Sequence, residues 1–431
     1  MAHPHLTGPA KDDQIVIVGA GVFGLSLALE LSSRGYKSIS VLDRYLPPVI
    51  DGSSVDISRV IRTDYADPLY AKMAKEALDG WMTEYNAFYH HSGFVMLSET
   101  HANTYIEKCK EVLREQGKFL EEFNSADKIK DIYPSIQGDL SAMTAYHNPA
   151  GGWADAESSI RWLAHRCSLA GISFLTGSQG TVISLKMDGP CVIGVQVASG
   201  RAIAASQVIL ATGAWSNRLV DMSHATSSSG QPVGFIQLTE EEAKGLEKTP
   251  VMINLTSGVF CFPPTPDTHV LKIARHGFGY ATQVHVEGSN RTVSSPKLDG
   301  ENATSAFLPH DAEQGLRQGL RQLMPDFADR PFMNCRLCWY TDTPEGNFVV
   351  DRHPQFQGLF VATGGAGHAF KFLPVLGRYL ADCFEGKASE EIRQKWRLRE
   401  SFGASKMPMS GDGSRGGPPL RVLAPHEQAK L

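Results

Sequence analysis

The sequence predicts an α/β fold in which a discontinuous sheet domain is interrupted by an inserted α+β domain of mixed sheet and helices. The run Ile15–Val18 is β-branched and lacks polar alternation, which is typical of a strand buried on both faces of a parallel sheet. Two later segments, 208–211 and 359–362, repeat this pattern and run into Thr-Gly. Because these strands lie far apart in the sequence, we expect the sheet domain to be discontinuous.

The stretches between the strands differ from them in composition. Residues 91–150 are rich in charged helical residues, and 235–330 contain alternating stretches with many turn residues. We therefore assign 14–90, 151–230 and 335–399 to the sheet domain, and 91–150 and 231–334 to the inserted domain. Residues 400–431 are rich in Gly, Pro and Ser and are predicted to form a flexible C-terminal tail.

The composition of the 431 residues is that of an ordinary globular protein. With 41 Lys and Arg against 46 Asp and Glu, the net charge is −5, and no basic block is present to bind nucleic acid or an anionic membrane. The longest uncharged apolar stretch, 15–29, is shorter than the roughly 20 residues that span a bilayer. Seven scattered cysteines fit a reducing compartment better than secretion. We expect a small-molecule ligand and no metal.

A glycine-rich turn follows the first predicted strand and opens a helix. Gly19 permits the tight turn, Gly21 lets a pyrophosphate approach the backbone, and Gly24 allows close packing of helix on strand. Asp43 ends the next strand, where it can accept hydrogen bonds from ribose hydroxyls. This context predicts a Rossmann-like dinucleotide-binding domain, although the motif alone does not distinguish NAD from FAD.

Two further strand ends favour FAD. The segments 208–215 and 359–372 each end a strand in glycine, which allows backbone contact with a second part of an extended ligand. The alternative is that both are ordinary turns between a strand and a helix.

Taken together, the motifs resemble those of the FAD-dependent amine oxidases of the D-amino-acid oxidase superfamily. The resemblance is to the monomeric sarcosine oxidase branch, with its fungal pipecolate, saccharopine and fructosyl amino acid oxidases, and it covers about residues 14–399. The motifs that carry it are Gly19–Gly24, Ser58–Arg62, Leu271-Lys272 followed by His276, Cys338–Pro344 and Gly367–Lys371.

The resemblance implies that the Cys338 thiol is joined covalently to the flavin. The pair Cys335 and Cys338 also forms a C-x-x-C motif, but no second ligand pair lies at zinc spacing and no thioredoxin pattern surrounds it. A buried free cysteine can also serve as a small apolar side chain. We interpret Cys335 in that way.

Flavin oxidation of amino acids needs cations, because the reduced flavin, the substrate carboxylate and the reduced oxygen are all anionic. The resemblance implies that Arg62 and Lys371 hold the substrate carboxylate, that Arg59 lies near the flavin, and that Lys272 activates oxygen. The alternative for each is an exposed surface charge. For Lys272 that alternative is weaker, because this residue interrupts an apolar run at a strand position.

The family's amine pocket is matched by His276 and Tyr340. A histidine there can tune the protonation of the amine. Phe260 stands where the family has a tyrosine, which suggests a changed substrate, and Ala369 replaces a glycine, which puts the geometry of that loop in doubt.

The resemblance also yields a set of cofactor-binding positions along the chain. They are Gly19, Gly21, Val22, Phe23, Gly24, Asp43, Arg44, Ser53, Ser54, Arg59, Val182, Gly213, Cys338, Gly367, His368, Phe370 and Lys371.

The predicted activity is that of an FAD-dependent oxidase of a secondary amine. A hydride would pass from the carbon next to nitrogen to flavin N5, giving an imine, and oxygen would be reduced to hydrogen peroxide. The alternatives are a flavin dehydrogenase, an enzyme of oxidative cyclisation on an amino-acid-derived secondary metabolite, and a noncatalytic flavin sensor. We expect a monomer, and the sequence leaves the identity of the amine open.

The last three residues, Ala429-Lys430-Leu431, resemble the Ser-Lys-Leu peroxisomal signal that an import receptor reads. We expect the tail to hold this triplet clear of the fold, and the enzyme to be peroxisomal or otherwise cytoplasmic.

Overall fold

The chain forms two compact units, each built from three separate stretches. In the computed structural model, residues 9–99, 103–117, 121–400 and 409–431 are described. Unit 1 comprises 1–55, 157–227 and 341–409, and unit 2 comprises 56–156, 228–340 and 410–431. Residues 56–90, which we assigned to the sheet domain, fall in unit 2, because β3 (Arg59–Ile61) pairs with β8 (Gly152–Ala154) and not with the parallel sheet.

Unit 1 is built on a six-stranded sheet in the order β22-β23-β13-β1-β2-β9. All neighbouring pairs are parallel except β22 with β23, so the parallel strands follow the order of a doubly wound nucleotide-binding sheet. The predicted α/β fold class is thereby confirmed. The sheet strands are β1 (Gln14–Val18), β2 (Ser38–Leu42), β9 (Ser173–Leu175), β13 (Gln207–Leu210), β22 (Val349–Arg352) and β23 (Leu359–Thr363).

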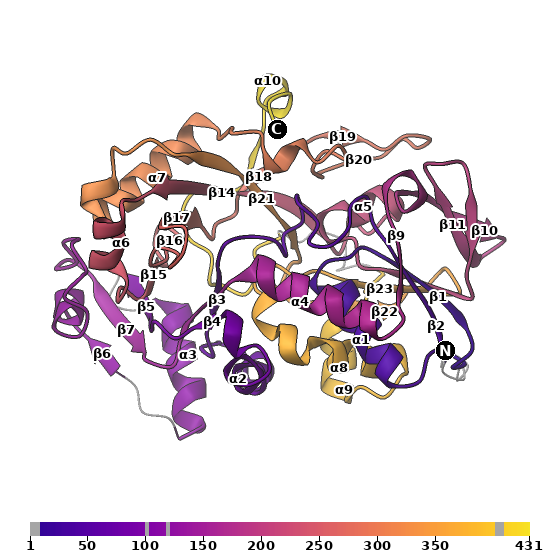
Figure 1. The fold of residues 1–431 in the computed structure, drawn as a ribbon, viewed down its shortest axis with the longest axis horizontal. Helices are drawn as coiled ribbons and strands as arrows, with labels where there is room; N and C mark the ends of the chain where they lie inside the picture. The colour runs from indigo at the N-terminus through magenta and orange to yellow at the C-terminus, as the bar shows by residue number, and fades with distance from the viewer. Residues whose placement is uncertain (1–8, 100–102, 118–120, 401–408) are drawn as a thin grey trace. The chain divides into compact units, whose positions relative to one another are not determined.

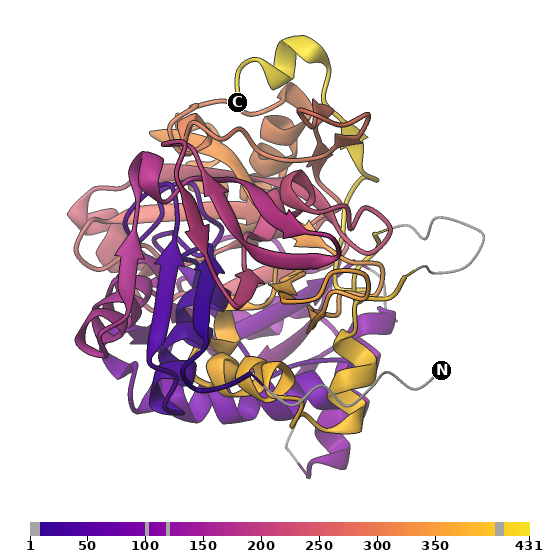
Figure 2. The same ribbon diagram turned by 90° about the vertical axis from the view of Figure 1, so that its right-hand side faces the viewer.

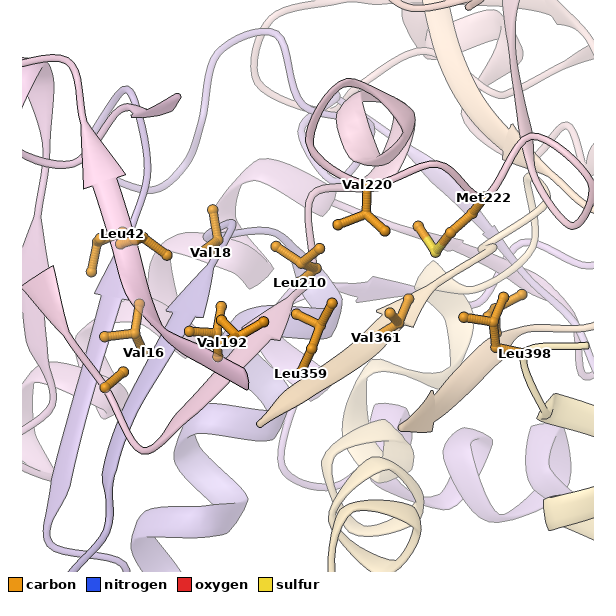
Figure 3. Close-up of a cluster of buried hydrophobic side chains, with 14 of the residues drawn as sticks. Val16, Val18, Leu42, Val192, Leu210, Val220, Met222, Leu359, Val361 and Leu398 are labelled. Atoms are coloured by element: carbon orange, nitrogen blue, oxygen red, sulfur yellow. The ribbon is translucent and has the colours of Figure 1, made fainter. Parts of the chain in front are cut away.

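The three strands predicted from their apolar runs lie side by side in this sheet. Val16 pairs with Val208, and Val208 pairs with Leu359, and all three side chains are buried. Figure 3 shows this cluster, in which side chains from the sheet pack with Val192. Burial on both faces explains why these strands lack polar alternation.

The remaining elements of unit 1 are five helices and a small antiparallel sheet among its described residues. Helices α1 and α8 pack so closely that a Cβ at Gly377 would lie 2.4 Å from the carbonyl oxygen of Ser26. The elements are α1 (Val22–Ser33), α4 (Ala156–Leu169), α5 (Ser216–Leu219), α8 (Leu373–Phe384), α9 (Glu390–Trp396), β10 (Val182–Asp188), β11 (Cys191–Val197) and β12 (Ala202–Ala204).

Unit 2 is built on a ten-stranded mixed sheet. Its strands follow the order β24-β18-β14-β17-β16-β15-β5-β7-β6, with β21 also paired to β14, and Figure 1 shows β14, β17 and β16 side by side. The strands are β5 (Phe94–Ser98), β6 (Glu121–Phe123), β7 (Thr144–Asn148), β14 (Ser227–Gln237), β15 (Val251–Asn254), β16 (Val259–Cys261), β17 (Val270–Arg275), β18 (Tyr280–Ala281), β21 (Asn334–Asp342) and β24 (Arg421–Val422).

Helices and two smaller sheets complete unit 2. The helices are α2 (Pro68–Met82), α3 (Thr104–Glu115), α6 (Glu240–Leu246), α7 (His310–Leu323) and α10 (Pro425–Gln428). The short strands are β3 and β8 with β4 (Tyr89–His90), and β19 (Val284–His285) with β20 (Thr292–Val293). Within the described ranges, no helix has the length and apolar character needed to cross a bilayer.

The prediction of a flexible C-terminal tail is wrong for residues 409–431. This segment adds β24 to the large sheet by pairing Arg421 with Tyr280, and Leu431 is only 3% exposed. Figures 1 and 2 show it in yellow, ending in α10. The glycines support close packing here, since a Cβ at Gly416 would lie 2.3 Å from the carbonyl oxygen of Leu255. The rest of the predicted tail from 401 to 408 lies outside the described residues.

Candidate active site

The predicted glycine turn lies at the carboxyl ends of β1 and β13 in unit 1. Gly19 has a φ of +111°, and a Cβ there would lie 2.4 Å from the carbonyl oxygen of Ala211. A Cβ at Gly24 would lie 1.9 Å from the carbonyl oxygen of Gly19. Only glycine fits either position, because the clashing atoms belong to the backbone.

Two side chains hold this turn. Asp43 Oδ2 accepts a hydrogen bond of 2.7 Å from the N–H of Ala20, and Ser54 Oγ accepts one of 2.9 Å from the N–H of Val22. Burial raises the pKa of Asp43, and the hydrogen bonds from Ala20 and Arg44 oppose that shift.

The start of helix α1 suits an anionic ligand. Its N-cap, Gly21, has no side chain to accept a hydrogen bond from the first turn, and that turn contains no acidic residue. Ser54 accepts from the N–H of Val22, but no acidic side chain of the first turn offsets the positive end of the helix dipole. These residues fit the pyrophosphate of a dinucleotide.

The remaining predicted cofactor positions in unit 1 lie around this turn or at other strand ends. Arg44 makes a two-point ion pair with Asp51, at 2.8 and 2.9 Å, and stacks 4.5 Å over the Trp215 ring. Phe23 packs edge-on against Phe348. Ser53 and Val182 are half-buried, and Gly213 has a φ of +51° after β13.

The loop after β23 positions the last predicted group of unit 1. Gly367 has a φ of +79°, His368 Nε2 lies 2.7 Å from the carbonyl oxygen of Gly346, and Phe370 is buried. Lys371 is 6% exposed, and its Nζ donates to the carbonyl oxygen of His368 at 2.9 Å. Ala369 has a φ of −70°, which alanine adopts readily, so its replacement of a glycine does not strain this loop.

In unit 2, Lys272 lies in β17 and shares a buried carboxylate with Arg59. Lys272 is 2% exposed, and its Nζ lies 2.8 Å from Asp56 Oδ2 and 2.6 Å from the carbonyl oxygen of Ser58. Arg59 forms an ion pair with the same Asp56 carboxylate, and its Nη2 lies 3.5 Å from Cys338 Sγ. The structure thus brings Lys272, Arg59 and Cys338 together.

Two cations, Lys272 and Arg59, share the Asp56 carboxylate. Burial lowers the pKa of Lys272 to about 7, with Arg59 adding to this shift and Asp56 opposing it. Burial alone would raise the pKa of Asp56, but Lys272 and Arg59 outweigh it and hold that pKa well below its usual range. Asp56 was not among the predicted site residues, although its position three residues before Arg59 was a usable signal.

His276 and Tyr340 also lie together, in a chain of hydrogen bonds. His276 Nδ1 lies 3.3 Å from the Tyr340 hydroxyl, and Nε2 lies 2.9 Å from Ser414 Oγ, which donates to Asp412 at 2.5 Å. Since the Ser414 proton goes to Asp412, a neutral His276 donates from Nε2 and accepts at Nδ1. Ser414 and Asp412 were missed because they were assigned to the tail.

Arg62 lies in an aromatic box elsewhere in unit 2. Its guanidinium is 4.8 Å from the Tyr65 ring and 5.7 Å from the rings of Phe94 and Tyr105. Nη2 donates to the Tyr105 hydroxyl at 2.9 Å, whereas the buried Nη1 has no hydrogen-bond partner in the described part of the chain. A buried guanidinium nitrogen without an acceptor fits a site that receives a carboxylate.

Cys338 and Cys335 lie on β21 three residues apart, so they face opposite sides of the sheet. Cys338 packs with the cluster of Val233 and Phe235. Burial raises the pKa of Cys335, with Glu313 of α7 adding to the shift. Phe260, predicted at the pocket wall, is half-buried and packs edge-on against Phe262.

The chain is similar to known proteins in both sequence and structure. The family described as FAD dependent oxidoreductase matches residues 14–383. L-saccharopine oxidase of Schizosaccharomyces pombe is 34% identical over 416 residues, covering 91% of this chain and 94% of that protein. Peroxisomal sarcosine oxidase of Mus musculus is 25% identical, covering 85% and 90%. The structure of fructosamine oxidase (Amadoriase II) from Aspergillus fumigatus superposes with a TM-score of 0.85 at 28% identity, covering 96% of both chains.

Proposed function

Because the chain belongs to the family of FAD-dependent oxidoreductases, we propose that it is an oxidase of a secondary amine, namely an N-alkyl or cyclic amino acid or a derivative of one. The observation that carries this proposal is the buried cluster of Lys272, Arg59 and Asp56 beside Cys338. FAD, when bound, would accept a hydride from the carbon next to nitrogen, giving an imine, and pass its electrons to oxygen as hydrogen peroxide.

Lys272 and Arg59 would stabilise negative charge where oxygen is reduced. The cluster places two cations in a buried setting, where a fixed charge stabilises a developing anion more than it would in water. The Ser58 carbonyl oxygen and Asp56 hold the Lys272 ammonium in place, so little reorganisation is needed during the reaction.

Arg62 would bind the substrate carboxylate, because its buried Nη1 lacks an acceptor among the described residues. Lys371, the other residue predicted to hold the carboxylate, is a buried cation of unit 1. The aromatic rings around Arg62 exclude water and strengthen a charge-assisted hydrogen bond to a carboxylate. The names of the relatives, which include saccharopine and sarcosine oxidases, support an amino acid as the substrate.

His276 would keep the substrate amine neutral, which is the form that can lose a hydride. When Nε2 donates to Ser414, the acceptor atom of the ring is Nδ1. Nδ1 can take a proton from the amine when the Tyr340 hydroxyl turns away from it. Asp412 stabilises the resulting imidazolium through Ser414.

We assign the covalent flavin link to Cys338, not to Cys335. Arg59 Nη2 lies 3.5 Å from Cys338 Sγ, so this thiol contacts the cation that we expect near the flavin. Cys335 is on the opposite face of β21, where the charges of α7 surround it.

A peroxisomal location is part of the proposal and is supported by the name of the murine relative. The final triplet is folded onto unit 2, since Leu431 is buried and Lys297 Nζ donates to the Ala429 carbonyl oxygen at 3.3 Å. An import receptor would therefore have to displace a short helix, α10, before reading Ala429-Lys430-Leu431.

The amine oxidase proposal predicts peroxide release from a panel of N-alkyl amino acids. Arg62→Met should raise the KM for these acids by about tenfold or more, because a hydrogen-bonded charge pair is lost. The matching amines without a carboxylate should be poorer substrates of the unchanged enzyme and respond little to the substitution. Equal turnover of acid and amine would show that Arg62 holds no carboxylate.

The Asp56–Lys272 pair predicts the pH dependence of flavin reoxidation. The ammonium is present below its pKa, so the rate with oxygen should fall as the pH rises through about 7. Asp56→Asn removes the group that raises this pKa, so the fall should move to lower pH by about one unit or more. Stopped-flow reoxidation measures the shift. The control is Asp64→Asn, which changes a buried carboxylate that accepts a hydrogen bond from Tyr146. This substitution should leave the pH profile of reoxidation unchanged. An unchanged pH profile in Asp56→Asn would show that the charge of Lys272 does not control the reaction with oxygen.

The Cys338 assignment predicts flavin that stays with the chain after acid denaturation. Cys338→Ala should release it, whereas Cys335→Ala, on the same strand, should retain it. Absorbance of the precipitated protein and of its supernatant gives the result. Free flavin from the unmutated protein would falsify the link.

The peroxisomal proposal predicts puncta for a fluorescent protein fused ahead of residue 1, coinciding with a peroxisomal marker. Deletion of 429–431 should make the signal diffuse. Diffuse signal with the triplet intact would mean that packing of Leu431 prevents receptor binding.

A further inference from the structure

Unit 2 contains a cavity of about 430 Å³ that no part of the proposed reaction uses. Its walls come from β14, β18, the end of β17, the start of α7 and the C-terminal segment. The lining residues on which the argument depends are Arg275, Tyr280, Asp311, Pro418, Arg421 and Val422.

The cavity and the Lys272 cluster are on opposite sides of the large sheet. Side chains alternate along a strand, so Lys272 and Arg275, three residues apart in β17, point in opposite directions. Lys272 contacts Asp56. Arg275 instead lies against α7, where a Cβ at Gly315 would be 1.8 Å from its Nη2. The glycine leaves room for the guanidinium.

Arg275 is a buried cation that lies near Asp311 but forms no ion pair with any described residue. It is 9% exposed, its buried Nε has no hydrogen-bond partner, and no ion pair of its side chain is found within the described ranges. Burial lowers its pKa, but arginine stays charged in proteins. A buried charge without an ion pair lowers the stability of the folded protein, and a bound anion would offset this loss.

The other charges of the lining are paired with one another. Asp311 accepts from Arg421 at 2.9 Å and from the Tyr280 hydroxyl at 2.8 Å. Arg421 also makes a two-point ion pair with Glu427, at 2.7 and 2.8 Å, so within the described ranges Arg275 is the lining cation that has no ion pair. The remaining wall is apolar, with three prolines, Leu420 and Val422.

We propose that this cavity binds a small monocarboxylate with an apolar body. The single unpaired charge matches a monoanion, and the planar guanidinium of Arg275 matches a carboxylate. The apolar body would lie against Pro418 and Val422, and the volume suits a molecule of amino-acid size or somewhat larger.

The test uses the flavin-loaded full chain and phenylacetate as the probe, with phenylacetamide as its uncharged counterpart. Calorimetry should detect binding of phenylacetate. Phenylacetamide should bind about tenfold or more weakly, because it cannot form a charge pair with Arg275. Arg275→Gln and, independently, Val422→Trp, which fills the cavity, should each weaken phenylacetate binding to a similar extent. Arg321→Gln, an exposed arginine of the same helix α7, is the control and should have no effect.

The aromatic box of Arg62 could also take a carboxylate, so the titration is repeated in Arg62→Met. Binding that survives Arg62→Met and is lost in Arg275→Gln or Val422→Trp places the probe in the cavity. Binding that neither cavity variant weakens, binding lost only in Arg62→Met, equal binding of the amide, or no binding at all would overturn the proposal.

Discussion

The Asp56 carboxylate is the interaction on which the candidate active site depends. Two cations, Lys272 and Arg59, lie in the interior of unit 2, and neither could remain charged there without a buried anion. The same carboxylate holds both cations in place. Under the proposed function, these cations would stabilise an anion during the reaction.

Strand β17 extends this constraint through the large sheet. The side chains of β17 alternate between the two faces of the sheet, so Lys272 contacts Asp56 on one face and Arg275 lies against α7 on the other. The neighbours β14 and β16 fix both directions through their hydrogen bonds. The C-terminal segment contributes on both sides as well, since Ser414 contacts His276 and Arg421 lines the cavity. The segment that composition marked as a tail is thus a structural part of unit 2.

Sequence reasoning found the features whose signal is local. The strands 15–18, 208–211 and 359–362 were identified because burial on both faces removes polar alternation, and they are indeed neighbours in one sheet. Gly19 and Gly24 were identified from their spacing between a predicted strand and a predicted helix, and the structure shows backbone atoms where their side chains would be. Lys272 was identified from the family resemblance, and its place within an apolar run made an exposed surface charge the weaker alternative.

The features that sequence reasoning missed depend on contacts between distant segments. Asp56 gains its role only when β17 places Lys272 beside it, and Ser414 only when the C-terminal segment reaches His276. The glycines of that segment illustrate the ambiguity, because the same residue type permits a flexible chain and a very close backbone contact. At Gly416 the second role applies, since the carbonyl oxygen of Leu255 occupies the space that a side chain would need. Composition cannot separate the two roles, because the deciding atom belongs to a residue far away in the sequence.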